Sequence, residues 1–150
     1  MGFIFPTTYD QSLGLKELIK RAVGPNNLEN INSNITQERF PLQGTDVRRV
    51  NLRVEPYKDG ETRKEAAKRL TAAGHVLGNT GDLAGFLHDH PKEMEKWNWV
   101  LAISEDSSSA HPGGYVYAPY ALVLGAFRVF GLPDGRYRLN SADGILVLCE

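Results

Sequence analysis

Two histidines separated by one residue are the side chains in this sequence that most directly offer chemistry. His88 and His90 flank Asp89, and Pro91 follows them. Imidazole nitrogens bind zinc, and a bound zinc ion can activate water for hydrolysis. Residues two apart on a helix point about 200° away from each other, so both rings face one ion only where the chain bends before Pro91. The pattern therefore leaves two interpretations: a zinc site, or an exposed helical histidine followed by a helix-junction histidine.

The segment 85–91 resembles the His-x-His-Pro segment of the JAMM metalloproteases. In that family the two histidines are zinc ligands at a strand end, which would imply a metal-dependent hydrolase. The family's Ser-x-x-Asp is not found after the proline, where Trp99 stands instead. The segment is also similar to the cupin signature, because Glu95 follows the two histidines, but the later histidine of that signature is missing. A zinc hydrolase using His88 and His90 is the alternative function.

A second set of residues fits binding rather than catalysis. Tyr115 and Tyr117 would share one face of a strand, and Arg136 and Arg138 are spaced likewise on another strand. Aromatic rings beside guanidinium groups stack and neutralise single-stranded nucleic acid. The same residues would also serve as half-buried tyrosines and solvated arginines at a sheet edge. These four are the candidate binding residues.

Other catalytic signatures are missing from the sequence. The serines at 104 and 107–109 lack a Gly-x-Ser-x-Gly elbow, and there is no phosphate-binding glycine loop. Cys149 is the single cysteine, which excludes an internal disulfide and a thiolate zinc site. We therefore expect a non-enzymatic binding or interaction module without a cofactor, whose partner is a protein or a nucleic acid.

Composition sets the class of protein. The 150 residues are 41% hydrophobic and 23% charged, as in an ordinary single domain. The formal net charge of −1 excludes a strongly basic nucleic-acid wrapper. Residues 1–75 hold 12 Lys/Arg against 9 Asp/Glu, a net of +3, and residues 76–150 hold 5 against 9, a net of −4, with the basic excess between Arg39 and Arg69. No leader or membrane-spanning stretch is recognisable, so we expect a cytoplasmic protein that does not enter a membrane.

Hydrophobic periodicity predicts helices first and strands last. Helical spacing and the Thr62–Glu65 capping box predict helices over residues 12–23, 62–74 and 80–90, with a shorter helix from Pro91. Alternation predicts strands over residues 47–54, 97–104, 115–130, 136–139 and 145–149. This order predicts one α+β domain, residues 1–150, in which N-terminal and central helices pack on a C-terminal antiparallel sheet of about four strands.

Two further expectations concern particular segments. Residues 26–34 contain five asparagines and are predicted to form a loop, so residues 1–40 are expected to be a loosely attached N-terminal segment.

Trp97 and Trp99 would lie on one strand face with Leu101 and Ile103, as core residues that join the helices to the sheet.

Several residues of the second half carry a wider resemblance: Phe86-Leu87, His90-Pro91, Trp97, Gly113-Gly114 and Pro119. With them, residues 75–150 resemble small uncharacterised proteins of uncultivated candidate-phyla bacteria, to which no activity is assigned. Because the shared residues are mostly apolar or turn-forming, the resemblance implies a structural role for His90 and Pro91.

Overall fold

The computed structural model describes residues 3–104, 109–110, 116–133 and 139–149. Within them the elements are, in chain order, β1 (Phe5–Asp10), η1 (Gln11–Leu13), α1 (Leu15–Val23), η2 (Pro25–Asn30), β2 (Val47–Pro56), α2 (Arg63–Ala72), β3 (Val76–Leu77), α3 (Thr80–Asp89), α4 (Pro91–Met94), β4 (Val100–Leu101), β5 (Ser109–Ala110), β6 (Val116–Tyr117), β7 (Tyr120–Leu124), β8 (Phe127–Gly131) and β9 (Gly144–Cys149). The predicted helices are confirmed, including the capping box in which the Thr62 side chain accepts from the Glu65 N–H and the Glu65 side chain accepts from the Thr62 N–H.

Seven of the described strands form one mixed sheet, in the order β1-β2-β9-β4-β7-β8, with β3 also paired to β9. The chain is α+β, but the prediction of a C-terminal antiparallel sheet of about four strands is wrong. Strands come from the whole chain, and β4 runs parallel to β9. Strand β1 was not predicted because Pro6 interrupts its sequence. A proline is tolerated there since β1 lies at the edge of the sheet.

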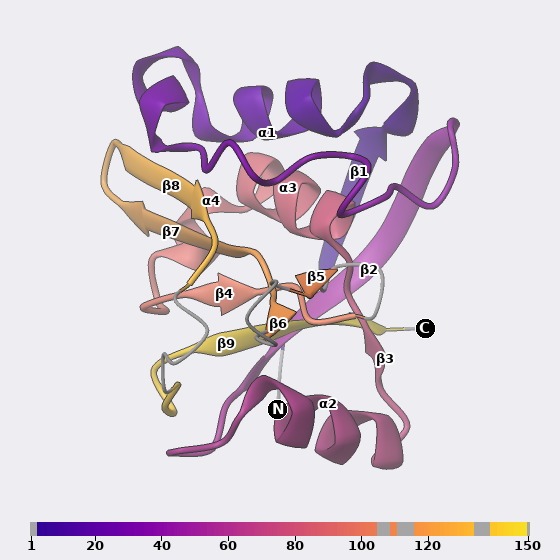
Figure 1. The fold of residues 1–150 in the computed structure, drawn as a ribbon, viewed down its shortest axis with the longest axis vertical. Helices are drawn as coiled ribbons and strands as arrows, with labels where there is room; N and C mark the ends of the chain where they lie inside the picture. The colour runs from indigo at the N-terminus through magenta and orange to yellow at the C-terminus, as the bar shows by residue number, and fades with distance from the viewer. Residues whose placement is uncertain (1–2, 105–108, 111–115, 134–138, 150) are drawn as a thin grey trace.

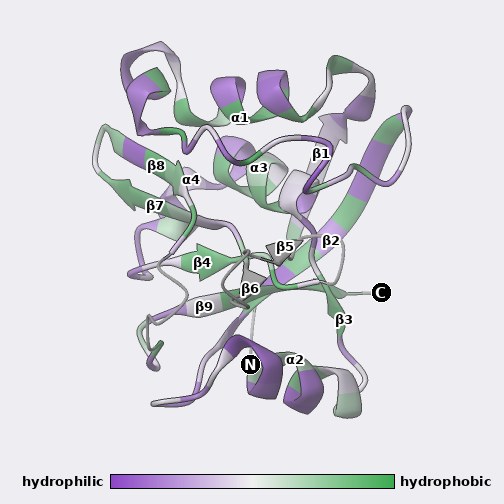
Figure 2. Ribbon diagram, in the orientation of Figure 1, coloured by the Kyte–Doolittle hydropathy of each residue, from purple (hydrophilic) through white to green (hydrophobic). Residues whose placement is uncertain are grey.

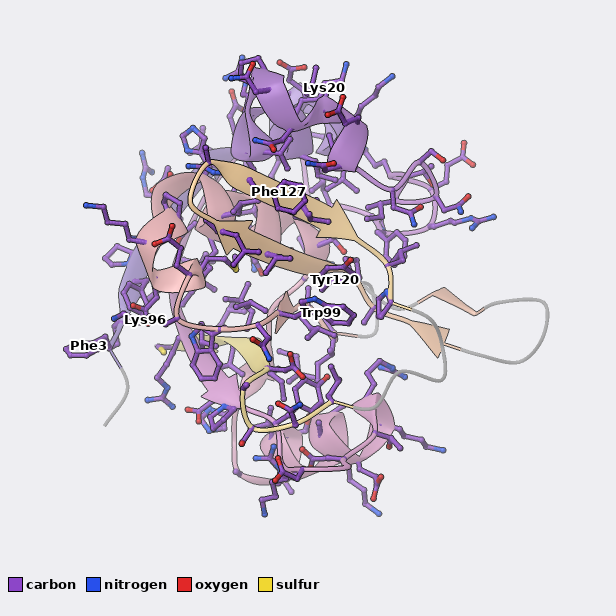
Figure 3. The ribbon with its side chains drawn as sticks, turned by 90° about the vertical axis from the view of Figure 1, so that its left-hand side faces the viewer. Phe3, Lys20, Lys96, Trp99, Tyr120 and Phe127 are labelled. Carbon is purple, nitrogen blue, oxygen red and sulfur yellow. The ribbon has the colours of Figure 1, made fainter. Side chains whose placement is uncertain are left out.

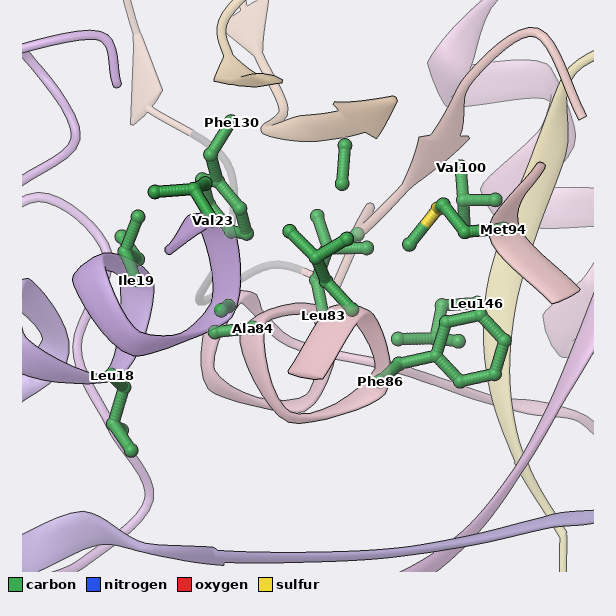
Figure 4. Close-up of a cluster of buried hydrophobic side chains, with 14 of the residues drawn as sticks. Leu18, Ile19, Val23, Leu83, Ala84, Phe86, Met94, Val100, Phe130 and Leu146 are labelled. Atoms are coloured by element: carbon green, nitrogen blue, oxygen red, sulfur yellow. The ribbon is translucent and has the colours of Figure 1, made fainter. Parts of the chain in front are cut away.

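Helices cover both faces of this sheet. In Figure 1 the helices α3 and α4 lie between the β7–β8 hairpin and the strands β1 and β2, with α1 above them and α2 below the sheet. Figure 3 shows the same arrangement from the side. The upper core joins α1 and α3 to the sheet through buried side chains such as Ile19, Leu83, Phe86 and Leu146 (Figure 4). The lower core is smaller and packs Leu70 of α2 against the opposite face. In the described part of the chain, no helix is long and apolar enough to cross a membrane.

The central strand β9 explains why strict alternation fails as a guide here. Leu146 belongs to the upper core, whereas Ile145 and Val147 belong to the lower one. The strand is therefore apolar on both faces and appears green along most of its length in Figure 2. Likewise, Val100 faces the upper core and Leu101 faces the lower core.

The outer edge of strand β1 is hydrogen-bonded to side chains at the end of α3. The Thr8 N–H donates to Asp89 Oδ2 at 3.1 Å. His90 Nε2 donates to the carbonyl oxygen of Pro6 at 2.7 Å. These bonds occupy two outward-facing backbone groups that would otherwise pair with another strand.

The opposite edge, β8, is covered by the asparagine-rich segment. The Asn27 side chain donates to the carbonyl of Ala126 at 2.9 Å and accepts from the N–H of Arg128 at 3.2 Å. Further along, Asn30 donates to the Arg128 carbonyl, and the Asn32 N–H donates to the Phe130 carbonyl. Asparagine suits this position because its amide both donates and accepts, as a strand backbone does. The predicted loop is therefore an ordered cover for the edge of the sheet.

Asp82 ties the edge of the sheet to α3. Its buried carboxylate accepts from the Tyr9 hydroxyl at 2.6 Å, from Arg48 Nε at 2.9 Å and from the Asn79 N–H at 3.1 Å. The Asp82 N–H in turn donates to the Asn79 side chain, which completes a capping box. Burial and the neighbouring Asp82 charge raise the pKa of Tyr9, so the phenol stays protonated and donates. One carboxylate thus links β1, β2 and the first turn of α3.

Gly85 lets β1 lie close against α3. A Cβ atom at this position would lie 2.7 Å from Tyr9 Cδ1 and 2.9 Å from Thr7 Cγ2. Neither neighbour is at the free end of a long side chain, so the strand would have to move. The glycine is required here by the closeness of the strand.

We predict that Gly85→Ala lowers the free energy of unfolding by about 1 to 2 kcal/mol, although alanine favours helix by about 1 kcal/mol, because the overlap with Tyr9 and Thr7 outweighs that gain. Urea denaturation measures the change. Thr71→Ala, at an exposed position of α2, is the control and should leave stability within about 0.5 kcal/mol of wild type. A Gly85→Ala protein as stable as wild type would contradict the close packing of β1.

Candidate binding face

Three of the four candidate binding residues, Tyr115, Arg136 and Arg138, lie outside the described residues. Tyr117 belongs to β6, where its backbone pairs with Ser109 of β5, and its side chain also lies outside the description. The proposed tyrosine and arginine surface therefore stays a prediction.

The two histidines of the His-x-His-Pro segment have separate partners. His90 uses Nε2 for the Pro6 carbonyl, and its ring packs against Phe5 and Phe86, with centroid distances of 5.2 and 5.6 Å. His88 is more exposed and lies with Nδ1 2.9 Å from Asp89 Oδ1. Within the described residues, no group of three or more His, Cys, Asp or Glu side chains is placed to hold a metal ion. The geometry thus gives His90 a structural contact at the edge of β1.

A cavity of about 460 Å³ lies beside Asp82 and is lined by Arg48, His75 and Asn79 as well. Its main charged groups are already engaged, because both Asp82 oxygens accept hydrogen bonds and Arg48 donates to them. The ring of His75 lies 3.5 Å from Arg53 Nη2. These contacts hold the fold together and leave no nucleophile and base paired for catalysis among these four side chains.

The lower face of the β7–β8 hairpin carries large apolar side chains outside both cores. Ala121, Val123 and Phe130 point into the upper core, so alternation puts the intervening residues on the opposite face. Together with Trp99, which stacks on this surface, they form what we call the open face: Trp99, Tyr120, Leu122, Leu124, Phe127 and Val129. None of these six side chains is charged.

The open face is exposed because α2 covers only part of the sheet. Leu70 of α2 packs in the cluster that contains Ile145 and Leu101, and this cluster ends at Trp99 and Tyr120. Beyond that pair Leu124 is 64% exposed and Phe127 is 47% exposed. Figure 3 shows Phe127, Tyr120 and Trp99 one below another on the side of the molecule that faces the viewer. A contiguous apolar surface of this kind on a folded chain is typical of a contact site.

A stacked aromatic pair forms the boundary between the lower core and the open face. The rings of Trp99 and Tyr120 lie 3.9 Å apart at an interplanar angle of 13°. On the neighbouring strand, Gly131 pairs with Tyr120, and a Cβ atom there would lie 2.9 Å from its ring. Gly131 thus lets the tyrosine ring lie flat across β8, and Trp99 stacks against the same ring.

Asp143 positions the tryptophan. Its buried carboxyl group accepts hydrogen bonds from the backbone N–H groups of Asn140 and Trp99. Burial raises the pKa of this carboxyl, and the two hydrogen bonds oppose the rise. The Gly144 N–H also donates to the Trp99 carbonyl at 2.8 Å. The backbone of Trp99 is therefore held at both its N–H and its carbonyl.

The hairpin that carries the open face is also fixed at its tip. The Gly125 N–H, in the turn between β7 and β8, donates to Glu95 Oε1 at 3.2 Å. Gly125 has a φ of 61°, a value that favours glycine, as a tight turn requires. With the asparagine bonds along β8, these contacts hold the surface in one shape before any partner binds.

The prediction that both tryptophans lie on one strand face holds for Trp99 but not for Trp97. Trp99 packs on the lower core with Leu101 and Ile103, as expected, but Trp97 packs against the upper core. The reason is that β4 includes only Val100 and Leu101, so strand alternation does not extend back to Trp97. The indole Nε1 of Trp97 is buried without a hydrogen-bond partner in the described residues.

We predict that Trp99 and Tyr120 stabilise the protein jointly. In a double-mutant cycle with Trp99→Leu and Tyr120→Leu, the coupling free energy should be about 0.5 to 1.5 kcal/mol, because stacked aromatic rings contribute that much beyond the area they bury. Chemical denaturation of the four proteins gives the value. Pairing Trp99→Leu with the exposed His88→Ala should give additive effects. Additivity between Trp99 and Tyr120 would mean that the stack does not form.

We predict a pH-dependent gain in stability from Asp143→Asn. A carboxyl group whose pKa is raised by folding is protonated more readily in the native state, so its contribution to stability falls as the pH rises from the unfolded pKa through the folded one. An asparagine oxygen in the place of Oδ2 still accepts from the Asn140 N–H, and the side chain does not titrate. The stability of the variant relative to wild type should therefore rise between about pH 3 and pH 7. Denaturation at each pH tests this, and a difference that is constant or falls with pH would contradict it.

Comparison with known proteins does not identify a relative. No family model matches the sequence, no curated protein is significantly similar to it, and no solved structure matches the fold. The resemblance of residues 75–150 to proteins of candidate-phyla bacteria thus stays an expectation. Support for a function comes instead from the contacts and exposure of this chain's own residues.

Proposed function

We propose that this protein is a non-enzymatic interaction module that binds a protein partner through the open face. The observation that carries the proposal is the exposure of Leu124 and Phe127 beside the Trp99–Tyr120 stack, on a hairpin whose turn is hydrogen-bonded to Glu95. An interface of this kind has an apolar centre and gains affinity when its surface is fixed before binding.

The edges of the sheet support a face-on contact rather than addition of a strand. A partner strand beside β1 would have to displace Asp89 and His90 from the backbone of Thr8 and Pro6. A strand beside β8 would have to displace the asparagine segment, including the buried Asn27. Each displaced group would lose a hydrogen bond, so strand addition is disfavoured at both edges.

The chemistry of the open face favours a protein over a nucleic acid. Single-stranded nucleic acid is bound by exposed aromatic rings with cations between them. The six residues of the open face include no cation, and the rings of Trp99 and Tyr120 cover one another. Aliphatic side chains such as Leu122 and Val129 offer no stacking surface, but they pack well against another apolar protein surface.

We take a second copy of this chain as the partner. Two sheet faces pack about 10 Å apart with interdigitating side chains. Because the open face is apolar and uncharged, a two-fold arrangement brings no like charges together. A symmetric contact then places each hairpin against the same hairpin of the other copy, as in most homodimers.

The test is sedimentation velocity of the full chain over a wide range of concentration. The wild type should form a dimer, and Leu124→Lys with Phe127→Lys should raise the dimer dissociation constant about a hundredfold or more, because the interface would bury unpaired charges. Both positions are exposed, so the monomer should keep its thermal stability. Val76→Lys, at a residue 57% exposed and outside the open face, is the matched control and should dimerise like wild type.

Three outcomes would reject the proposal. A wild type that stays monomeric at every concentration rejects the second copy as the partner. A dimer that persists in the Leu124→Lys/Phe127→Lys protein rejects the open face as the contact. Binding of a labelled single-stranded oligonucleotide that is lost in this variant and kept in Val76→Lys would replace the protein partner with nucleic acid.

A further inference from the structure

A second hollow lies between α1 and the segment that follows it. The chain after η2 runs alongside α1 (Figure 1), and together they enclose a cavity of about 490 Å³. This volume falls in the range of about 300 to 1,000 Å³ that holds small organic ligands. The cavity shares no residue with the open face.

The apolar part of the cavity lining is aliphatic. Leu15 and Ile19 come from α1, and Ile31 and Ile35 come from the segment across from it. Leu28 also lines the cavity and is 45% exposed. A linear alkyl chain lying against these side chains would be stabilised in proportion to the apolar surface that it removes from water.

Some of the polar groups around the cavity are already paired with other parts of the chain. Gln37 Oε1 accepts from the N–H of Leu15 at 3.1 Å, at the start of α1. Asn32 Oδ1 accepts from the N–H of Asn34 at 2.9 Å, and the Asn32 N–H donates to Phe130. None of these groups is charged, so the charged partners of a ligand have to come from other residues.

Two lysines supply those partners. Lys16 and Lys20 line the cavity from adjacent turns of α1, and no aspartate or glutamate lines it with them. Neither lysine forms an ion pair with another of the described residues, whereas Glu17 on the same helix pairs with Arg21 at 3.3 Å. Figure 3 shows Lys20 at the outer end of the molecule, far from Trp99. The cavity thus combines an aliphatic interior with two positive charges, which complements an anionic amphiphile.

We propose that this cavity binds a linear alkyl carboxylate, with the carboxylate between Lys16 and Lys20 and the alkyl chain against Ile19, Ile31 and Ile35. Carboxylate is favoured as the headgroup because two ammonium groups one helical turn apart can each donate to one of its oxygens. The site is independent of the open face and of whatever partner binds there.

Isothermal titration with decanoate, kept below its micelle-forming concentration, tests this inference. Decanoate should bind the wild type at one site, and Lys16→Gln with Lys20→Gln should weaken it about tenfold, as expected for two partly exposed charge contacts. Lys64→Gln with Lys68→Gln removes an exposed lysine pair of the same spacing from α2 and should leave binding unchanged. Decanoate should also raise the melting temperature of the wild type and of this control more than that of the first variant.

Each other result would overturn the inference. Decanol binding as tightly as decanoate would remove the role of the carboxylate. Decanoate binding that is equally strong in Lys16→Gln/Lys20→Gln would place the ligand elsewhere. Absence of decanoate binding together with attachment to vesicles of anionic phospholipid would replace the cavity with a membrane-surface contact. The Leu124→Lys/Phe127→Lys protein should bind decanoate like wild type, so failure of this inference is distinguishable from failure of the open-face proposal.

Discussion

The buried carboxylate of Asp82 is the interaction on which the arrangement of the layers depends. A buried charge is costly unless it is paired and hydrogen-bonded, and here it accepts from Tyr9, Arg48 and Asn79. These partners come from β1, β2 and the start of α3, so satisfying one side chain fixes all three relative to one another. The close approach of β1 at Gly85 follows from the same placement. Once α3 is fixed, its last residues reach the outer edge of β1.

The hydrogen bonds that cover the two edges of the sheet then restrict where a partner can bind. The outer backbone groups of β1 are hydrogen-bonded to the side chains of Asp89 and His90, at the end of α3. The outer backbone groups of β8 are hydrogen-bonded to Asn27 and its neighbours. Protected edges are how sheet proteins avoid unwanted strand pairing. Between these two protected edges, the lower face of β7 and β8 stays accessible, and that face is apolar. The same asparagine segment that closes β8 also forms one wall of the α1 cavity through Ile31.

Local signals predicted the local structure well. The capping box at Thr62 and the break before Pro91 depend on bonds between residues a few positions apart, and both are confirmed. The sheet could not be predicted in this way, because its order depends on pairings between distant segments. β1 pairs with β2 at separations of 37 to 47 residues, from Asp10 with Val47 to Phe5 with Leu52, and the parallel contact of β4 with β9 joins Val100 to Gly144. Asp82 gave no signal in the sequence, since a helix-capping aspartate is common and its partner Tyr9 is 73 residues away.

The open face could not be predicted from the sequence either, because it also depends on how distant segments pack. The sequence of β7 nevertheless gives a weak indication of it. Its inward residues are the small Ala121 and Val123, whereas Tyr120, Leu122 and Leu124 point the other way. A strand that is apolar on both sides is typical of a sheet covered on both sides. In β9 that expectation is met, because α2 lies over Ile145 and Val147. In β7, Leu122 and Leu124 lie beyond the cluster that α2 covers, so this part of the strand has the composition of a two-sided core with only one side filled by the described chain. A partner that packs on the open face would supply the missing side.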